Sequence, residues 1–569
     1  MKNLGLIIAV FALSVVAGFF FFNSFNNQPS ENKEMTEKLK QFITSYEQKV
    51  APLFRDAGIA YFNATISGKE EDYNRSAELT IALSKVYTNK ADYKILADIR
   101  DSKGVTDPLL ARQLEKLYLL YKSNQMDEKK QEEIINLSTA IENRFSTYRT
   151  TLNGKQVSDN DIETILSEST SSIEVENAWR ASKELGPVVA ADVIKLVKMR
   201  NEAAREMGFP NYHTMSLQIS EQDPKEIDAL MDELDKLTAP EFKKLKAEID
   251  GFLANRFGIP TEQLMPWHYQ NRFFQEAPKI YNVDLDTYYK DVNIEEVTTK
   301  YYAGLGLPID KMIAASDLYE KPGKYQHAYC THIDRSGDVR VVCNIKPNSK
   351  WMGTMLHEFG HGVYDGYLDF NLPYTLREPA HTFTTEAIAM LFGRMYSSPL
   401  WMNENIGLSK ESADSIKTTT AKILKLEQLI FSRWVQVVYR FEKAMYANPD
   451  QDLNTLWWQL VEKYQLVKKP EGRDMPDWVT KIHIALYPAY YHNYQLGELL
   501  ASQLQHYITT KVMKLPAGTD VSFTNNPEVG KYLRTNVFAP GTLYHWNDMI
   551  ERATGEKLTA AYFAQQFVN

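Results

Sequence analysis

Residues 338–361 read DVRVVCNIKPNSKWMGTMLHEFGH, and this stretch changes character near its middle. The β-branched run from Val339 to Ile345 follows a Ser-Gly turn, which predicts a hairpin or a small sheet. Asn348 or Ser349 can cap a helix that starts directly afterwards. Apolar residues then recur at helical spacing from Trp351 to Val363, so the stretch predicts a strand that leads into a helix.

The run His-Glu-Phe-Gly-His at 357–361 of this helix is typical of a zinc site. Positions i and i+4 share one face of a helix, so His357 and His361 can both reach one ion. Glu358 lies where it can take a proton from a water held there. Gly360 costs about 1 kcal/mol relative to Ala, so we expect another element to pack closely against it. The alternative is a pair of buried, hydrogen-bonded histidines.

A catalytic zinc site needs a third protein ligand and an open position for water. Two common spacings of zinc ligands are not met here. In one pattern, Tyr364 and Tyr367 stand at the positions of a Gly and a His. In the other, His381 stands at the position of the Glu ligand. A third pattern, with a Glu 25 residues after the second His, is met by Glu386. Glu378 is a rival, but the proline after it disfavours a helix, so Glu386 is the favoured ligand.

The rest of the chain reads as a mostly α-helical protein. From about residue 34 to 300 glycine is sparse and apolar residues recur every three or four positions, and this pattern resumes after the small sheet. We find no linker inside the body, so residues 29–569 are predicted to form a single catalytic domain that contains the zinc site. The net charge of −9 argues against a nucleic-acid partner, which would require a basic surface.

The N-terminus predicts export. Lys2 precedes an apolar stretch, Leu4 to Phe22, that fits a cleaved signal peptide or an uncleaved membrane anchor. Residues 24–33 read as a polar linker, so residues 1–28 are taken as signal or anchor plus linker. Both interpretations place the folded body outside the cytoplasm, as a periplasmic, secreted or membrane-anchored protein. A buried N-terminal core helix is the remaining alternative.

A second cluster of polar side chains occurs late in the chain, in WVTKIHIALYPAYYHNYQLGELLASQL at 478–504. Lys481 and His483 stand among several tyrosine hydroxyls. Such a surface can stabilise an oxyanion and bind a carboxylate. The alternative is an aromatic packing stripe, because tyrosine is common in this chain.

These blocks, with TTEAI between them, follow the order seen in the angiotensin-converting-enzyme family of peptidyl-dipeptidases, which the chain resembles. It is also similar to thimet-type oligopeptidases. The resemblance is strong from about 325 to 505 and weaker elsewhere. It implies a large helical ellipsoid with a deep central channel, zinc at the channel floor and a small β-sheet beside the zinc.

The resemblance also implies residue roles. His357, His361 and Glu386 would hold one Zn²⁺ per chain, Glu358 would be the general base, and His483 would donate to the substrate carbonyl.

Further roles follow from the tyrosine cluster. Lys481 and Tyr490 would bind the C-terminal carboxylate of the substrate. The oxyanion-stabilising tyrosine falls at Asn493 on strict spacing; Tyr494, one residue later, is preferred, with Tyr491 in reserve.

The resemblance places His332 on a strand that pairs with the substrate, and it matches Cys330 and Cys343 to a disulfide. An exported protein can form such a bridge, while the alternative is two unpaired buried thiols.

Two residues depart from the pattern of the family. Asn493 replaces an arginine that binds activating chloride, so we expect weak or absent chloride activation. Met390 replaces an acidic residue that supports the metal ligands.

The sequence therefore predicts a monomeric zinc metallopeptidase that acts on short peptides and releases C-terminal dipeptides. An oligopeptidase or a carboxypeptidase on the same scaffold is the main alternative. A non-catalytic peptide-binding protein is a remote one.

Overall fold

The structure, a computed structural model, describes the backbone of residues 4–568 and the side chains of residues 32–568. It is mostly α-helical with two small two-stranded sheets, which confirms the predicted fold class. Contacts between residues divide the chain into two compact units. The single domain at 29–569, expected because the sequence shows no internal linker, stays a prediction.

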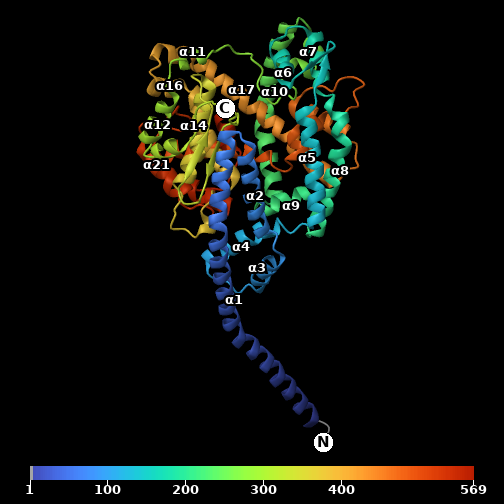
Figure 1. The fold of residues 1–569 in the computed structure, drawn as a ribbon, viewed down its shortest axis with the longest axis vertical. Helices are drawn as coiled ribbons and strands as arrows, with labels where there is room; N and C mark the ends of the chain where they lie inside the picture. The colour runs from blue at the N-terminus through green and yellow to red at the C-terminus, as the bar shows by residue number, and fades with distance from the viewer. Residues whose placement is uncertain (1–3, 569) are drawn as a thin grey trace. The chain divides into compact units, whose positions relative to one another are not determined.

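Unit 1 comprises Met1–Gln125, Ile333–Ser336 and Phe370–Glu378. Its elements are α1 (Leu4–Ser67), α2 (Glu70–Tyr87), α3 (Lys90–Ser102), α4 (Pro108–Lys122) and the 3₁₀ turn η3 (Tyr374–Leu376) (Figure 1). The backbone is helical through residues 24–33, where the sequence suggests a linker. The predicted signal or anchor at 1–28 lies outside the described side chains. Among the described residues, no helix has the length and apolar character needed to cross a bilayer.

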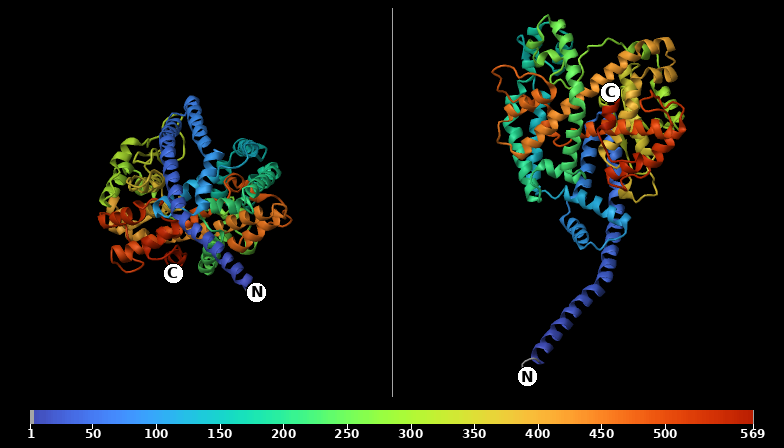
Figure 2. Two further views of the ribbon diagram at one scale, coloured as in Figure 1. Left: turned by 90° about the horizontal axis from the view of Figure 1, so that it is seen from below. Right: turned by 180° about the vertical axis from the view of Figure 1, so that it is seen from behind.

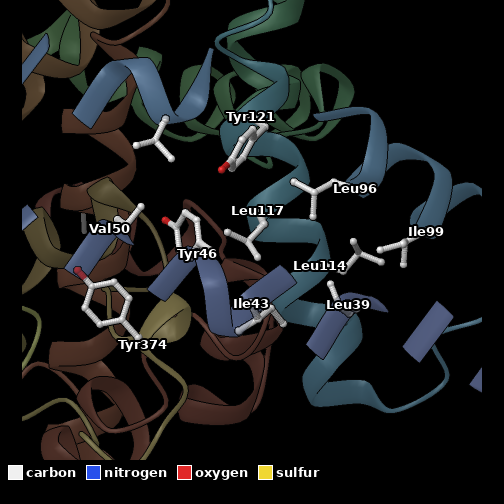
Figure 3. Packing of buried hydrophobic residues seen from close by; sticks show 11 residues of the cluster. Leu39, Ile43, Tyr46, Val50, Leu96, Ile99, Leu114, Leu117, Tyr121 and Tyr374 are labelled. Atoms are coloured by element: carbon white, nitrogen blue, oxygen red, sulfur yellow. The ribbon is translucent and has the colours of Figure 1, made fainter. Parts of the chain in front are cut away.

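The core of unit 1 is built from α1, α2, α3, α4 and η3, with Val86 contributed by α2 and Tyr374 by η3. Side chains of α1, α3 and α4 converge on one another, as Figure 3 shows for Tyr46, Leu96 and Leu117. Tyr121 of α4 contacts the ring of Tyr46 with centroids 6.4 Å apart. Aromatic pairs of this kind add to the stabilisation that comes from burial.

Unit 2 comprises Met126–His332, Gly337–Asp369 and Pro379–Asn569. Its helices are α5 (Glu128–Thr147), α6 (Asp159–Glu168), α7 (Ser172–Ser182), α8 (Leu185–Glu206), α9 (Tyr212–Ile219), α10 (Pro224–Phe257), α11 (Asp286–Tyr289), α12 (Ile294–Gly304), α13 (Asp310–Ala315), α14 (Ser349–Gly366), α15 (Thr382–Gly393), α16 (Pro399–Ile406), α17 (Lys410–Ala447), α18 (Leu453–Gln465), α19 (Ile482–Leu486), α20 (His492–Tyr507), α21 (Pro527–Leu533), α22 (Trp546–Thr554) and α23 (Ala561–Phe567). Its strands are β1 (Thr150–Leu152), β2 (Lys155–Val157), β3 (Tyr329–His332) and β4 (Val339–Val342). Short turns and π-helical segments are η1 (Thr261–Gln263), η2 (Pro266–Tyr269), η4 (Arg394–Ser397), η5 (Asp477–Thr480), η6 (Ile508–Val512) and η7 (Arg534–Phe538).

Local sequence signals set many of these helix ends. Asp223 caps α10 before Pro224, and Gly258 ends that helix in the left-handed conformation at φ 66°. In the interior of unit 2, α17 contacts α8, α10 and α20 and so connects elements far apart in sequence (Figures 1 and 2). Its buried apolar face forms much of the core of the unit.

The predicted hairpin is confirmed as β3 and β4. The strands pair antiparallel, with Cys330 opposite Val341 and His332 opposite Val339. β4 is bridged on its other side by Asp317, whereas β3 pairs only with β4 among the strands described. The helix α14 then starts after Asn348, whose side chain accepts a hydrogen bond from the Trp351 backbone.

Candidate functional site

Helices α14 and α15 bring three predicted metal ligands together. The Nε2 atoms of His357 and His361 each lie 3.8 Å from one carboxylate oxygen of Glu386. One ligand atom from each residue lies within 4.8 Å of the others. The set of two imidazoles and one carboxylate matches a catalytic zinc site with one open position, so the residues present fit the metal.

Close packing of the two helices positions these ligands. A Cβ atom at Gly360 would lie 2.7 Å from the Cα of Ala389 on α15, so only glycine allows this approach. Gly393, at the end of α15, similarly faces His357, with a Cβ position 3.2 Å from the Cβ of that histidine. The expectation of a close neighbour at Gly360 is therefore confirmed.

Burial sets the protonation states of the ligands. It lowers the pKa of His357 to about 4, and burial together with the His357 charge lowers the pKa of His361 to about 3. Both imidazoles are thus neutral near pH 7, the form that binds a metal. Burial, with a contribution from Glu498, raises the pKa of Glu386 to about 7. A bound cation would favour the charged carboxylate.

His361 has a hydroxyl partner that the sequence did not reveal. Its Nδ1 lies 2.8 Å from the Oγ1 of Thr385, the residue before Glu386. With Nε2 directed at the ligand cluster, Nδ1–H donates to that hydroxyl and fixes the ring orientation. His361 thus has a side-chain partner, although Met390 stands where the family resemblance implies an acidic residue.

Glu358 faces the small sheet. Its side chain is buried, and the backbone N–H of Cys330 on β3 interacts with its carboxylate. Burial and the neighbouring Glu386 raise the pKa of Glu358 to about 8. A carboxylate that binds a proton near neutral pH is suited to general acid–base work.

The rival ligand Glu378 has a different partner. It belongs to unit 1, where it forms an ion pair with Arg335. The three-residue cluster found among the described residues contains Glu386 instead.

Lys481 is a half-buried cation with a polar partner. Its Nζ donates to Oε1 of Gln275 at 2.6 Å, and it also lies 5.3 Å from the ring centre of Tyr491. Burial lowers the pKa of Lys481 to about 8. Sequence analysis missed Gln275, which lies in an irregular loop with no motif around it.

The tyrosines differ in their surroundings. Burial raises the pKa of Tyr490 and of Tyr494, and in both cases the Glu386 carboxylate contributes. Their rings contact each other at 5.5 Å. Tyr491 instead packs edge-on against Trp434 at 6.2 Å.

His483 precedes the tyrosines in the sequence, and Asn493 lies between Tyr490 and Tyr494. The ring of His483 contacts Tyr491 at 5.1 Å, and its buried Nδ1 has no hydrogen-bond partner among the described residues. Burial lowers the pKa of His483 to about 4. Asn493 accepts a hydrogen bond from Gln222 at 2.8 Å through its side-chain oxygen, so this oxygen has a structural partner.

The hairpin residues have local contacts. The side chain of His332 accepts a hydrogen bond from the backbone N–H of Gly337 at 3.1 Å, which supports the turn between β3 and β4.

Cys330 and Cys343 are free thiols in the structure, and burial raises the pKa of both. The disulfide between them stays a prediction.

Comparison with known proteins gives one family match. A family profile described as angiotensin-converting enzyme matches residues 33–567, which is nearly the whole chain. No curated protein matched the sequence.

Proposed function

Since the chain belongs to the angiotensin-converting-enzyme family of peptidases, we propose that it is a zinc-dependent peptidyl-dipeptidase acting on short peptides. The observation that carries this proposal is the convergence of His357, His361 and Glu386 beside the buried Glu358. We further propose that the protein is an exported monomer whose activity depends little on chloride.

The ligand set supports zinc as the metal, because two neutral imidazoles and one carboxylate suit that ion. When bound, zinc would acidify a water and polarise the scissile carbonyl. The Thr385 hydroxyl would hold His361 in the tautomer that binds through Nε2.

The side chains around the cluster would move the proton and stabilise charge. Glu358 would take a proton from the attacking water and deliver it to the leaving amine nitrogen. His483 and Tyr494 would donate hydrogen bonds to the oxygen that becomes negative, with Tyr491 as the reserve donor. The raised pKa of Tyr494 keeps its hydroxyl protonated, as a donor must be.

The proposed peptide site uses an edge strand and a half-buried cation. An extended peptide can pair with β3, which has one neighbouring strand, β4, in the described sheet and which carries His332. Lys481, Gln275 and Tyr490 would bind the free C-terminal carboxylate. The contact of Lys481 with Gln275 supports this role, because an uncharged amide does not neutralise the positive charge of the lysine.

The test is the digestion of one defined peptide in two forms, with a free and with an amidated C-terminus. Product masses would be read with and without a chelator, after elemental analysis of the purified protein. We expect stoichiometric zinc, release of a dipeptide from the free form, and poor cleavage of the amidated form. Lys481→Met should remove this preference, whereas Lys468→Met, at a lysine that contacts the backbone of Glu262, should keep it.

Equal cleavage of both peptide forms would contradict the role of Lys481 and favour an oligopeptidase. Release of single residues would favour a carboxypeptidase. Folded protein that lacks zinc, and does not regain it, would refute the metallopeptidase mechanism.

A further inference from the structure

A cavity of about 740 Å³ lies within unit 2 and contains none of the residues proposed above for metal, catalysis or peptide binding. Its walls come from η4, the first half of α17, the end of α20, the loop at 518–521 and α23. Its volume falls in the range that small-molecule sites occupy in proteins.

The cavity wall is cationic. Arg394, Lys417, Lys422 and Lys425 line it, while Asp520 is the one carboxylate among its described lining residues. Asp520 lies 3.3 Å from Lys417, and Glu241, which does not line the cavity, pairs with Lys425 at 2.6 Å. The excess positive charge is therefore that of Lys422 and Arg394. An excess of positive charge in a concave surface attracts anions.

Arg394 adds buried donors without partners. Its side chain is 9% exposed, and Nη1 makes a long contact of 3.5 Å with Gln566. Nε and Nη2 have no hydrogen-bond partner among the described residues, and Nη2 lies 3.8 Å from the nearest Glu498 oxygen. Ser502, a buried neighbour in the same wall, has an unpartnered hydroxyl as well. Buried polar groups normally have partners, so these atoms indicate a ligand.

Apolar side chains complete the wall. Leu424, Val521 and Phe567 line the cavity, and the Arg394 guanidinium lies 5.9 Å from the Phe567 ring centre. A ligand that fits has a charged head and an apolar body.

We propose that this cavity binds a small organic anion. Its carboxylate or phosphate group would accept hydrogen bonds from Arg394 and Ser502, and its apolar body would lie against Leu424 and Phe567. Charged hydrogen bonds of this kind are among the stronger ones in proteins. The proposal stands independently of the peptidase function.

The test is calorimetric titration of the zinc-loaded full-length protein with inorganic phosphate, phenyl phosphate and benzoate. Benzyl alcohol serves as the neutral probe, and the phosphate and benzoate arms identify the preferred head group. Arg394→Gln removes the guanidinium and its charge, and Ala421→Phe fills the cavity from an exposed position on its rim. Lys443→Gln is the matched control, because Lys443 lies on α17 outside the cavity and contacts Asp228.

We expect one anion per chain to bind, and both cavity variants to weaken binding at least about tenfold, as the loss of a charged hydrogen bond implies. The control variant should bind as the unaltered protein does. Ala421→Phe keeps the test valid should Arg394→Gln fail to fold.

Each of the following results would overturn the proposal. The first is the absence of saturable binding by every anion. The second is equal affinity in the unaltered protein and Ala421→Phe, which places the anion elsewhere. The third is binding that disappears when zinc is removed, or benzyl alcohol binding as tightly as benzoate.

Discussion

A methyl group added at Gly360 would meet the backbone of α15. The new Cβ would lie 2.7 Å from the Cα of Ala389, and this contact must lengthen by about 0.7 Å to reach 3.4 Å, the lower limit of ordinary contacts. Both atoms belong to helix backbones, so a side-chain rotation cannot relieve the overlap. The helices must separate, and Glu386 on α15 must move away from the two histidines on α14.

The expected cost follows from two opposing effects. Replacing glycine by alanine inside a helix is worth about 1 kcal/mol in helix propensity. Overpacking typically costs about 1–3 kcal/mol, so Gly360→Ala should be neutral to destabilising. Gly251→Ala in α10 is the matched control, because no atom lies within 4 Å of its Cβ position and only the propensity gain remains.

The assay combines chemical unfolding with zinc titration of the two variants and the unaltered protein. Gly251→Ala should be more stable than the unaltered protein and should keep its zinc affinity. Gly360→Ala should be less stable than Gly251→Ala by about 1–3 kcal/mol and should bind zinc more weakly. If the two variants gain equal stability and zinc affinity is unchanged, the close approach of α14 and α15 does not position the ligands.

Four further outcomes are expected. Glu386→Ala should lose zinc in elemental analysis, whereas Glu378→Ala should retain it; the opposite result would identify Glu378 as the ligand. Glu358→Gln should keep zinc but lower turnover by about 10²–10⁴-fold, the range of general acid–base catalysis, and near-normal turnover would remove Glu358 from the mechanism. Thr385→Val should weaken zinc binding by about 10–100-fold with the fold intact, so unchanged affinity would assign Thr385 no role in holding His361. Burial lowers the pKa of His213 from 6.5 to about 4. Between these two pH values the unfolded chain therefore binds a proton that the folded protein does not. Stability should therefore fall as the pH drops from 6.5 towards 4, by up to about 1.4 kcal/mol per pH unit, and His213→Phe should flatten this dependence in unfolding measurements.

The sequence was most informative where chemistry and local structure share one short segment. The spacing of His357 and His361 on a helix, the strand before it and the cap at Asn348 all follow from residues within a few turns of one another. The fold class was also predictable, because helical periodicity is a local property. The helical backbone at 24–33 differs from the expected linker, because the polar composition there was taken as a turn signal.

Contacts between distant segments were not predictable. Gln275 beside Lys481 joins residues about 200 positions apart, and nothing in the loop sequence marks it. The sequence does not mark Thr385, because a threonine before a glutamate has no special meaning on its own. Only the structure places the imidazole of His361 2.8 Å from its hydroxyl.

The sequence by itself determined the helical class, the HEFGH motif, the set of candidate ligands and the hairpin beside them, since these depend on spacing along a single segment. Only the tertiary structure decided that Glu386 joins the histidines while Glu378 pairs with Arg335, that Gly360 lies against Ala389, and that a cationic cavity forms around Arg394. The physical reason is that burial, charge pairing and close packing depend on which segments meet in space, and periodicity along the chain does not specify those partners.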